Sequence, residues 1–202
     1  MSYSQNDEEA FLLKYFSDQT GLLIDFGAAD GLVFSNSRAL MERGWSGVFV
    51  EANPIHCGAL ARLYENNEKA TIYNLGLSHV TGSIVPLHYS RQEPYGTTVQ
   101  PPEHWKSRLH EKPIYVGSVR PHVLLHRHAN ADLLLIDIDE QNYEILRSLY
   151  RGAGYELARI PLIVVEHNGC DHDKFLSLCE TYHDPRRIVH ETPENIILES
   201  AR

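Results

Sequence analysis

Short apolar runs alternate with segments of helical periodicity along most of the 202-residue chain. Runs at residues 21–26, 47–51, 71–77, 131–137 and 162–166 each have the length of a buried strand. Between them, apolar residues recur every three or four positions, as they do on one face of a helix. This alternation is typical of βαβ units, in which helices cover both faces of a mostly parallel sheet. The sequence therefore predicts a doubly wound α/β fold.

The expected helices carry boundary signals of their own. Ser35 or Ser37 can cap a helix for which Gly44 is the C-terminal stop. Asn53 followed by Pro54 is a cap residue with proline at the first helical position, which is a favoured start. We also expect helices at residues 123–126, 142–151 (stopped by Gly152) and 174–182, and a closing hairpin of strands 187–190 and 195–198, which adds an antiparallel edge.

The length fits one domain that spans residues 1–202. No apolar stretch approaches the roughly 20 residues of a membrane span, and the polar N-terminus lacks the apolar run of a secretory signal. We therefore expect a cytoplasmic protein without a membrane partner. The net charge of −9 argues against nucleic acid as a partner, because phosphate contacts need clustered Lys and Arg.

Residues 79–128 interrupt the alternating pattern. Much of this segment has little clear period, and it is rich in proline and aromatic residues. A long irregular segment inside a compact domain usually has a function, so we predict a variable acceptor-binding or lid segment here. Within it, residues 95–98 could close over an acceptor with Gly96 as a hinge, or could form an ordinary surface turn.

A glycine-containing turn, residues 25–31 (DFGAADG), follows the first predicted strand. Ligands of doubly wound sheets bind outside the carboxyl ends of the strands, which is where this turn lies. Gly27 and Gly31 would let the backbone approach a ligand closely, because neither carries a side chain. An ordinary strand-to-helix turn is the alternative.

The details of this turn separate two classes of cofactor. A dinucleotide site has the spacing G-x-G-x-x-G, whereas the outer glycines here lie four residues apart and Ala29 takes the middle position. Asp25 and Asp30 would repel a pyrophosphate but suit the ammonium and sulfonium groups of S-adenosylmethionine. The turn favours S-adenosylmethionine, and a nicotinamide-dependent oxidoreductase remains the alternative.

Glu51 ends the second predicted strand. A carboxylate at this place can accept hydrogen bonds from both ribose hydroxyls of an adenosine ligand. A solvated strand end is the other interpretation, but the glycine turn one strand earlier favours the adenosine site.

Polar residues also gather at the ends of the fourth and fifth strands. Asp137 and Asp139 lie on the same side if the strand continues that far, and Glu166, His167 and Asn168 end the neighbouring strand. Such a group could supply a general base or hold Mg²⁺ through oxygen ligands. A solvated strand end that caps the next helix is the simpler alternative. A divalent metal is therefore possible, but we predict none.

Taken together and in order, these motifs resemble the FkbM-like methyltransferases. The similarity excludes the middle segment, from about residue 79 to residue 128. This chain departs from the family pattern at Glu140, where glycine is usual, and at Asn142, where an acid is common. The matching segments are residues 4–12, 25–31, 34–37, 43–48, 51–54, 136–139, 142–143 and 165–168.

The resemblance implies a Rossmann-like class I methyltransferase fold, with a seven-stranded sheet whose last strand is antiparallel, and methyl transfer to an oxygen. It implies S-adenosylmethionine as cofactor and a small-molecule hydroxyl, such as that of a sugar, as acceptor. The methionine end would contact Asp25, Gly27, Ala28 and Gly31, and the ribose would contact Glu51. The remaining expected cofactor residues are Ser35, Asn36, Ala52 and Asp137.

An alcohol acceptor must lose its hydroxyl proton to a base. We predict Asp139 for this role, with His167 and His88 as further candidates. A non-catalytic binding domain of the same fold is the alternative from outside the enzymes, although the combination of Asp25, Gly27 and Glu51 argues against it.

Overall fold

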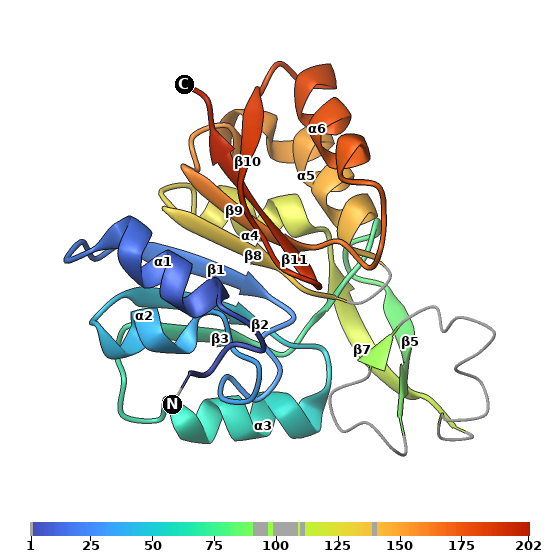
Figure 1. Ribbon diagram of the computed structural model, residues 1–202. Coiled ribbons are helices and arrows are strands. Elements are labelled where there is room, and N and C mark those ends of the chain that lie inside the picture. Colours follow the sequence, from blue (N-terminus) through green and yellow to red (C-terminus); the bar gives the residue numbers. More distant parts are fainter. Residues whose placement is uncertain (1, 91–96, 99–108, 110–111, 139–140) are drawn as a thin grey trace.

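The computed structural model describes residues 2–90, 97–98, 109, 112–138 and 141–202. Within these residues, a seven-stranded sheet has the order β10-β11-β9-β8-β1-β2-β3 (Figure 1). This is the predicted class I methyltransferase architecture. Its strands are β1 (Leu22–Phe26), β2 (Ser46–Val50), β3 (Ala70–Tyr73), β8 (Leu133–Ile136), β9 (Leu162–Glu166), β10 (Arg186–Glu191) and β11 (Asn195–Ser200).

Helices cover both faces of this sheet, because its strands are apolar on both sides. In β1, Leu23 packs with apolar residues of α1, α2 and α3. The next residue, Ile24, packs with those of α4, α5 and α6 on the opposite face. The doubly wound prediction is confirmed. The helices are α1 (Glu8–Phe16), α2 (Arg38–Glu42), α3 (Pro54–Leu63), α4 (Pro121–Arg127), α5 (Asn142–Leu157) and α6 (His172–Thr181).

The closing hairpin is also confirmed. β11 runs antiparallel to both of its neighbours, β9 and β10, so the last strand lies inside the sheet and β10 forms the edge. A short connection joins the two strands, in which the N–H of Thr192 donates to the carbonyl of Asn195 at 2.9 Å. Asn195, the first residue of β11, pairs with Glu166, the last residue of β9, so the connection lies beside the carboxyl end of β9.

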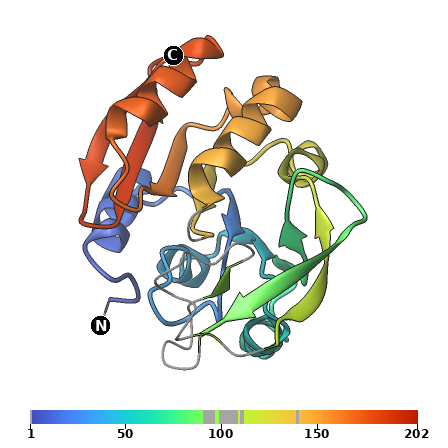
Figure 2. The ribbon, with the colours of Figure 1, turned by 90° about the vertical axis from the view of Figure 1, so that its right-hand side faces the viewer.

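Part of the middle segment, together with the short strand just before it, forms a second, four-stranded sheet of order β4-β7-β5-β6. Figures 1 and 2 show β5 and β7 beside the carboxyl ends of the main strands. Residues 95 and 96, where we expected the lid hinge, lie outside the described residues. The strands of this sheet are β4 (Gly76–Leu77), β5 (Ile84–Tyr89), β6 (Thr97–Thr98) and β7 (Ile114–Val119).

The single strand predicted at residues 71–77 is wrong, because the chain changes sheets within it. β3 ends at Tyr73, and β4 begins at Gly76 in the second sheet. The side chain of Asn74 donates from Nδ2 to the carbonyls of Glu51 and Ala52, at 2.8 and 3.1 Å. These bonds hold the chain at the carboxyl end of β2 while it turns away from the main sheet.

The helix stop predicted at Gly152 coincides with a kink in α5: the next residue, Ala153, has non-helical backbone angles (φ −148°, ψ 39°), and helical turns then continue to Leu157. The glycine also makes room for a neighbouring side chain. A Cβ at position 152 would lie 2.3 Å from Nδ1 of His122, which belongs to α4. The close packing of α4 on α5 thus accounts for this glycine. Among the described residues, no helix has both the length and the apolar character of a membrane span.

Candidate active site

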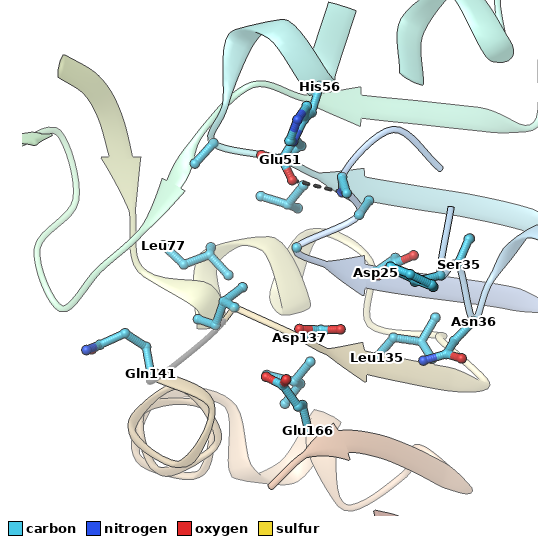
Figure 3. Close-up of a pocket in the computed structure, with 18 of the residues that line it drawn as sticks. Asp25, Ser35, Asn36, Glu51, His56, Leu77, Leu135, Asp137, Gln141 and Glu166 are labelled. Atoms are coloured by element: carbon cyan, nitrogen blue, oxygen red, sulfur yellow. Dashed lines mark hydrogen bonds between the residues drawn. The ribbon is translucent and has the colours of Figure 1, made fainter. Parts of the chain in front are cut away.

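A cavity of about 280 Å³ opens at the carboxyl ends of β1, β2, β8 and β9 (Figure 3). Its volume is close to the lower end of the range for small-molecule pockets. Leu75, Leu77 and Leu87 extend the lining onto the second sheet and the turn leading into it. The cavity brings together most of the residues we expected at the site: Asp25, Gly27, Ala28, Ser35, Asn36, Glu51, Ala52 and Asp137.

Asp25, near the carboxyl end of β1, lines this cavity. Asp25 is 7% exposed, and one of its carboxylate oxygens accepts a hydrogen bond from Oγ of Ser37 at 2.6 Å. Removal from water raises the pKa of Asp25 to about 6, although the bond from Ser37 acts in the opposite direction. No cation compensates this carboxylate within hydrogen-bonding distance in the described part of the chain.

We expect an Asp25→Asn variant to be more stable than the wild type by about 2 kcal/mol in ligand-free form at pH 8. The pKa of Asp25 is raised in the folded protein, so the carboxylate destabilises the fold only when it is charged. This cost is absent well below pH 3.8 and complete above about pH 6. An asparagine oxygen can still accept the bond from Ser37. Chemical denaturation at pH 4 and pH 8 measures the difference.

Asp132→Asn is a matched control. Asp132 accepts a hydrogen bond from the N–H of Leu22 at 2.9 Å, and Leu22 is at the opposite end of β1 from Asp25. We expect this control to change the free energy of unfolding by less than about 0.5 kcal/mol. An equal gain for Asp25→Asn at both pH values, or no gain at pH 8, would contradict a cost that arises from the charged form of Asp25.

The two glycines of the turn are required for packing within the protein. Gly27 has φ +92°, and a Cβ there would lie 1.7 Å from the carbonyl oxygen of Asp137 at the end of β8. Gly31 has φ +72°, and a Cβ there would lie 2.4 Å from Cδ1 of Leu60 on α3. Gly31 is not part of the cavity lining in the described residues. At Gly31 the close approach is therefore between parts of the chain, whereas Gly27 both packs against the end of β8 and lines the cavity.

Glu51 fastens the end of β2 to this turn. Its side chain is 5% exposed, and its two oxygens accept the N–H groups of Ala29 at 2.9 Å and Asn53 at 2.6 Å. Burial raises the pKa of Glu51 to about 7; these backbone hydrogen bonds oppose the rise, and the charge of Asp25 adds to it. Since each carboxylate oxygen has two lone pairs, Glu51 can accept further hydrogen bonds beyond these two.

The ends of β8 and β9 are joined through Asn142, the first residue of α5. Its Oδ1 accepts the N–H of Ile138 at 2.7 Å, and its Nδ2 donates to Oε2 of Glu166 at 2.8 Å. Asp137 and Glu166 both line the cavity, and Figure 3 places Asp137 between Glu51 and Glu166. Asp139, the predicted base, lies outside the described residues.

We expect an Asn142→Asp variant to lose about 2 kcal/mol of stability at pH 7, because a donor to Glu166 becomes a second carboxylate. Asn142 is 2% exposed, so water does not screen this repulsion. Denaturant unfolding measures the loss. A further Glu166→Gln change should restore most of it, since the amide can donate to the new carboxylate; no rescue in the double variant would contradict the pairing.

His167, our second candidate base, is not part of the cavity lining in the described residues. Its Nδ1 accepts the N–H of Gly169 at 3.0 Å, and its Nε2 lies 3.4 Å from the carbonyl of Thr192. The ring is thus directed toward the turn after β9 and the β10–β11 connection, which gives no geometric support for a catalytic role. His88 lies on β5 and is likewise absent from the described lining.

Several lining residues escaped the sequence analysis. His56 had no evident signal beyond its place in the first turn of a helix. Leu87 lies in the middle segment, whose structure we could not predict, and Leu75 and Leu77 lie where the chain leaves the main sheet within the single strand predicted at residues 71–77. Gln5 belongs to a motif of the family resemblance, but no physical argument connected it with the strand ends. The missed residues include Gln5, His56, Leu75, Leu77, Leu87, Gln141 and Asn195. Within the described ranges, no three His, Cys, Asp or Glu side chains form a group that could hold a metal ion.

Comparisons with known proteins point to one class of enzyme. The family model described as the methyltransferase FkbM domain matches residues 25–189. None of the curated proteins matches the chain.

Three solved structures share the fold at low sequence identity. The chain is similar to monomeric WbdD, with 14% identity and a TM-score of 0.55 over 98% of this chain and 41% of that one. Methyltransferase FkbM from Methylobacillus flagellatus KT has 13% identity and a TM-score of 0.51 over 89% of this chain and 43% of its own. Magnesium protoporphyrin IX methyltransferase from Synechocystis PCC 6803 was solved with bound S-adenosylmethionine. It has 10% identity and a TM-score of 0.51 over 96% of this chain and 76% of its own. The chain thus spans less than half the length of the first two.

Proposed function

The chain belongs to the methyltransferase FkbM domain family, and from this premise we propose that it transfers a methyl group from S-adenosylmethionine to a hydroxyl oxygen of a small molecule. The observation that carries the proposal is the cavity at the carboxyl ends of the strands, with Asp25 and Glu51 buried in its wall. The family match gives no support to a nicotinamide-dependent oxidoreductase.

The residues of the cavity fit the parts of this cofactor. The acceptor capacity left on the oxygens of Glu51 suits the hydroxyls of a ribose. The carboxylate of Asp25 suits the positively charged end, because burial without a counter-ion strengthens its attraction for a cation. Leu75, Leu77 and Leu87 provide an apolar wall that suits the adenine ring. When bound, the cofactor supplies a methyl group activated by the positive charge on its sulfur.

The remaining work of the protein is to position the acceptor and remove its proton. Alignment of two reactants in a fixed geometry contributes up to roughly 7–11 kcal/mol to a displacement of this kind. The proton of the acceptor hydroxyl must pass to a base near the ends of β8 and β9. We keep Asp139 as the proposed base; Asp137 and Glu166 are the carboxylates that line the described part of the cavity there.

Methyl transfer from isotope-labelled S-adenosylmethionine to a panel of neutral sugars and alcohols tests the reaction type. We expect label in an ether-linked methyl group, which survives mild alkali, and we expect none in an Asp25→Lys variant. Label found only on nitrogen or carbon would contradict transfer to oxygen. Cofactor binding without transfer to any member of the panel would favour the non-catalytic binding domain.

A further inference from the structure

Residues 2–7 precede α1 without forming a helix or strand, and this segment is fastened to the rest of the protein at both of its ends. We refer to it as the N-terminal strap. It lies outside residues 25–189, which the family model matches, and the proposed function gives it no role.

One end of the strap is fastened to α2 through Tyr3. The hydroxyl of Tyr3 donates to Oε1 of Glu42 at 2.8 Å, and the guanidinium of Arg38 lies 5.8 Å from the centroid of the Tyr3 ring. The N–H of Tyr3 also donates to Oε2 of Glu9 at 2.7 Å. Because α2 begins just after Asn36, which lines the cavity, this end lies beside the residues that follow β1.

The other end of the strap is fastened to the β10–β11 connection and the start of β11. The side-chain amide of Asn6 donates to the carboxylate of Glu194. Glu8, the first residue of α1, is 0% exposed, and its Oε1 accepts Oγ1 of Thr192 at 2.6 Å and Nδ2 of Asn195 at 2.9 Å. Burial opposes the ionisation of Glu8, but its hydrogen bonds outweigh this effect and lower its pKa. The strap therefore ends on a buried, charged anchor.

Gln5 lies between the two anchors, and it is the residue of the strap that belongs to the described cavity lining. Oγ of Ser4, just before it, donates to the carbonyl of Asn6, just after it, at 2.9 Å, so the backbone is held on both sides. Gln5 itself is exposed, and its Nε2 makes one long contact of 3.4 Å with Oε1 of Glu194. An amide has two N–H donors and an acceptor oxygen, so Gln5 can make further hydrogen bonds to a ligand.

The anchors of the strap select one part of the cofactor. The ribose site proposed at Glu51 lies at the end of β2, and the apolar wall continues from there onto the second sheet. The strap instead runs from the residues that follow β1 to the start of β11, and β8 and β9 lie between these two strands. A ligand group that meets Gln5 therefore lies on the side of the cavity away from the adenosine. The amino-acid end of S-adenosylmethionine carries an ammonium and a carboxylate, and an amide can accept from the first and donate to the second.

We propose that Gln5 hydrogen-bonds to the amino-acid end of the cofactor, and that the N-terminal strap positions it for this contact. The inference rests on the proposed function, because it takes the adenosine to lie at Glu51. Gln5 is then a cofactor-binding residue, whereas Tyr3, which is outside the described lining, acts only through Gln5. A strap that is anchored before the ligand arrives reduces the cost of ordering Gln5 on binding.

Two ligands that differ at the amino-acid end test this contact. S-adenosylhomocysteine and 5′-methylthioadenosine share the adenosine and the thioether, but the second compound lacks the amino acid. In titration calorimetry, we expect Gln5→Ala to weaken S-adenosylhomocysteine by about tenfold and to leave 5′-methylthioadenosine unchanged. Gln19→Ala is the matched control, because Gln19 is an exposed glutamine in the connection between α1 and β1; it should leave both affinities unchanged.

The variant Tyr3→Ala tests whether the strap positions Gln5. It removes the contacts with Glu42 and Arg38 without changing the described lining. We expect it to weaken S-adenosylhomocysteine by about threefold alone and to cause no further loss in a Gln5→Ala background. Additive losses would show that Tyr3 does not act through Gln5 and would contradict the positioning role.

A crystal structure of the S-adenosylhomocysteine complex shows the contact directly. We expect the side-chain amide of Gln5 within hydrogen-bonding distance of the amino or carboxylate group of the ligand. An amide directed elsewhere, an unchanged affinity for S-adenosylhomocysteine in Gln5→Ala, or an equal loss for both compounds would overturn the inference. Failure of the proposed function is distinct, because neither compound would then bind the wild-type protein.

Discussion

Replacement of Gly27 by alanine should lower the free energy of unfolding by about 4 kcal/mol, combining about 1 kcal/mol for a left-handed backbone with about 3 kcal/mol for overpacking. The added Cβ would lie 1.7 Å from the carbonyl oxygen of Asp137. That oxygen belongs to the backbone at the end of β8, so no side-chain rotation relieves the clash. Since a domain of this size shifts by about 2–4 °C for each kcal/mol, the melting temperature should fall by about 10 °C.

Gly82→Ala separates the two parts of this effect. Gly82 has a similar φ, +77°, but a Cβ there would meet nothing within 4 Å. This control should lose only about 1 kcal/mol, which is the cost of the backbone conformation. Equal losses in the two variants, measured by denaturant unfolding, would contradict the close packing of the β1 turn against β8.

Replacement of Glu51 by alanine should weaken the binding of S-adenosylmethionine by about 100-fold, or about 2.7 kcal/mol. The variant removes the carboxylate proposed to accept the ribose hydroxyls, and it also frees the N–H groups of Ala29 and Asn53. Glu51→Gln keeps the size of the side chain and one acceptor oxygen, so we expect an intermediate loss of about tenfold. Titration calorimetry measures both.

Binding should also weaken as the pH falls from 8 to 6. The pKa of Glu51 is raised to about 7, so a proton competes with the ribose hydroxyls for the carboxylate in this range. Glu51→Ala should remove the part of the pH dependence that Glu51 causes. Glu65→Ala, an exposed site just beyond α3, is the control and should leave the affinity unchanged. Unaltered affinity in Glu51→Ala would contradict a contact between Glu51 and the cofactor.

The local signals of the sequence were sufficient for most of the fold. Asn53 followed by Pro54 begins α3 as predicted, and Oδ1 of Asn53 accepts the N–H of Ile55 at 3.0 Å. The apolar runs of the main sheet are strands because helices bury both of their faces. In the site, Asp25 and Glu51 were accessible to sequence reasoning because each lies at the carboxyl end of a predicted strand.

The features that sequence reasoning missed depend on contacts between distant segments. Gly152 precedes a kink in α5, but no local pattern signals that the ring of His122 occupies the space that a side chain would need. Asn74 turns the chain out of the main sheet through bonds to the end of β2, and no local pattern signals this. Asn195 faces Glu8 across 187 positions of the chain, so only the folded protein connects the N-terminal motif with the cavity.

We propose that the cavity holds an adenosine compound with a charged or thioether sulfur. Titration calorimetry of the purified protein with S-adenosylmethionine, S-adenosylhomocysteine and NAD tests it most directly. We predict one site per chain for each of the first two compounds and no binding of NAD. Absence of binding for both sulfur compounds at millimolar concentration, or binding of NAD alone, would contradict the account.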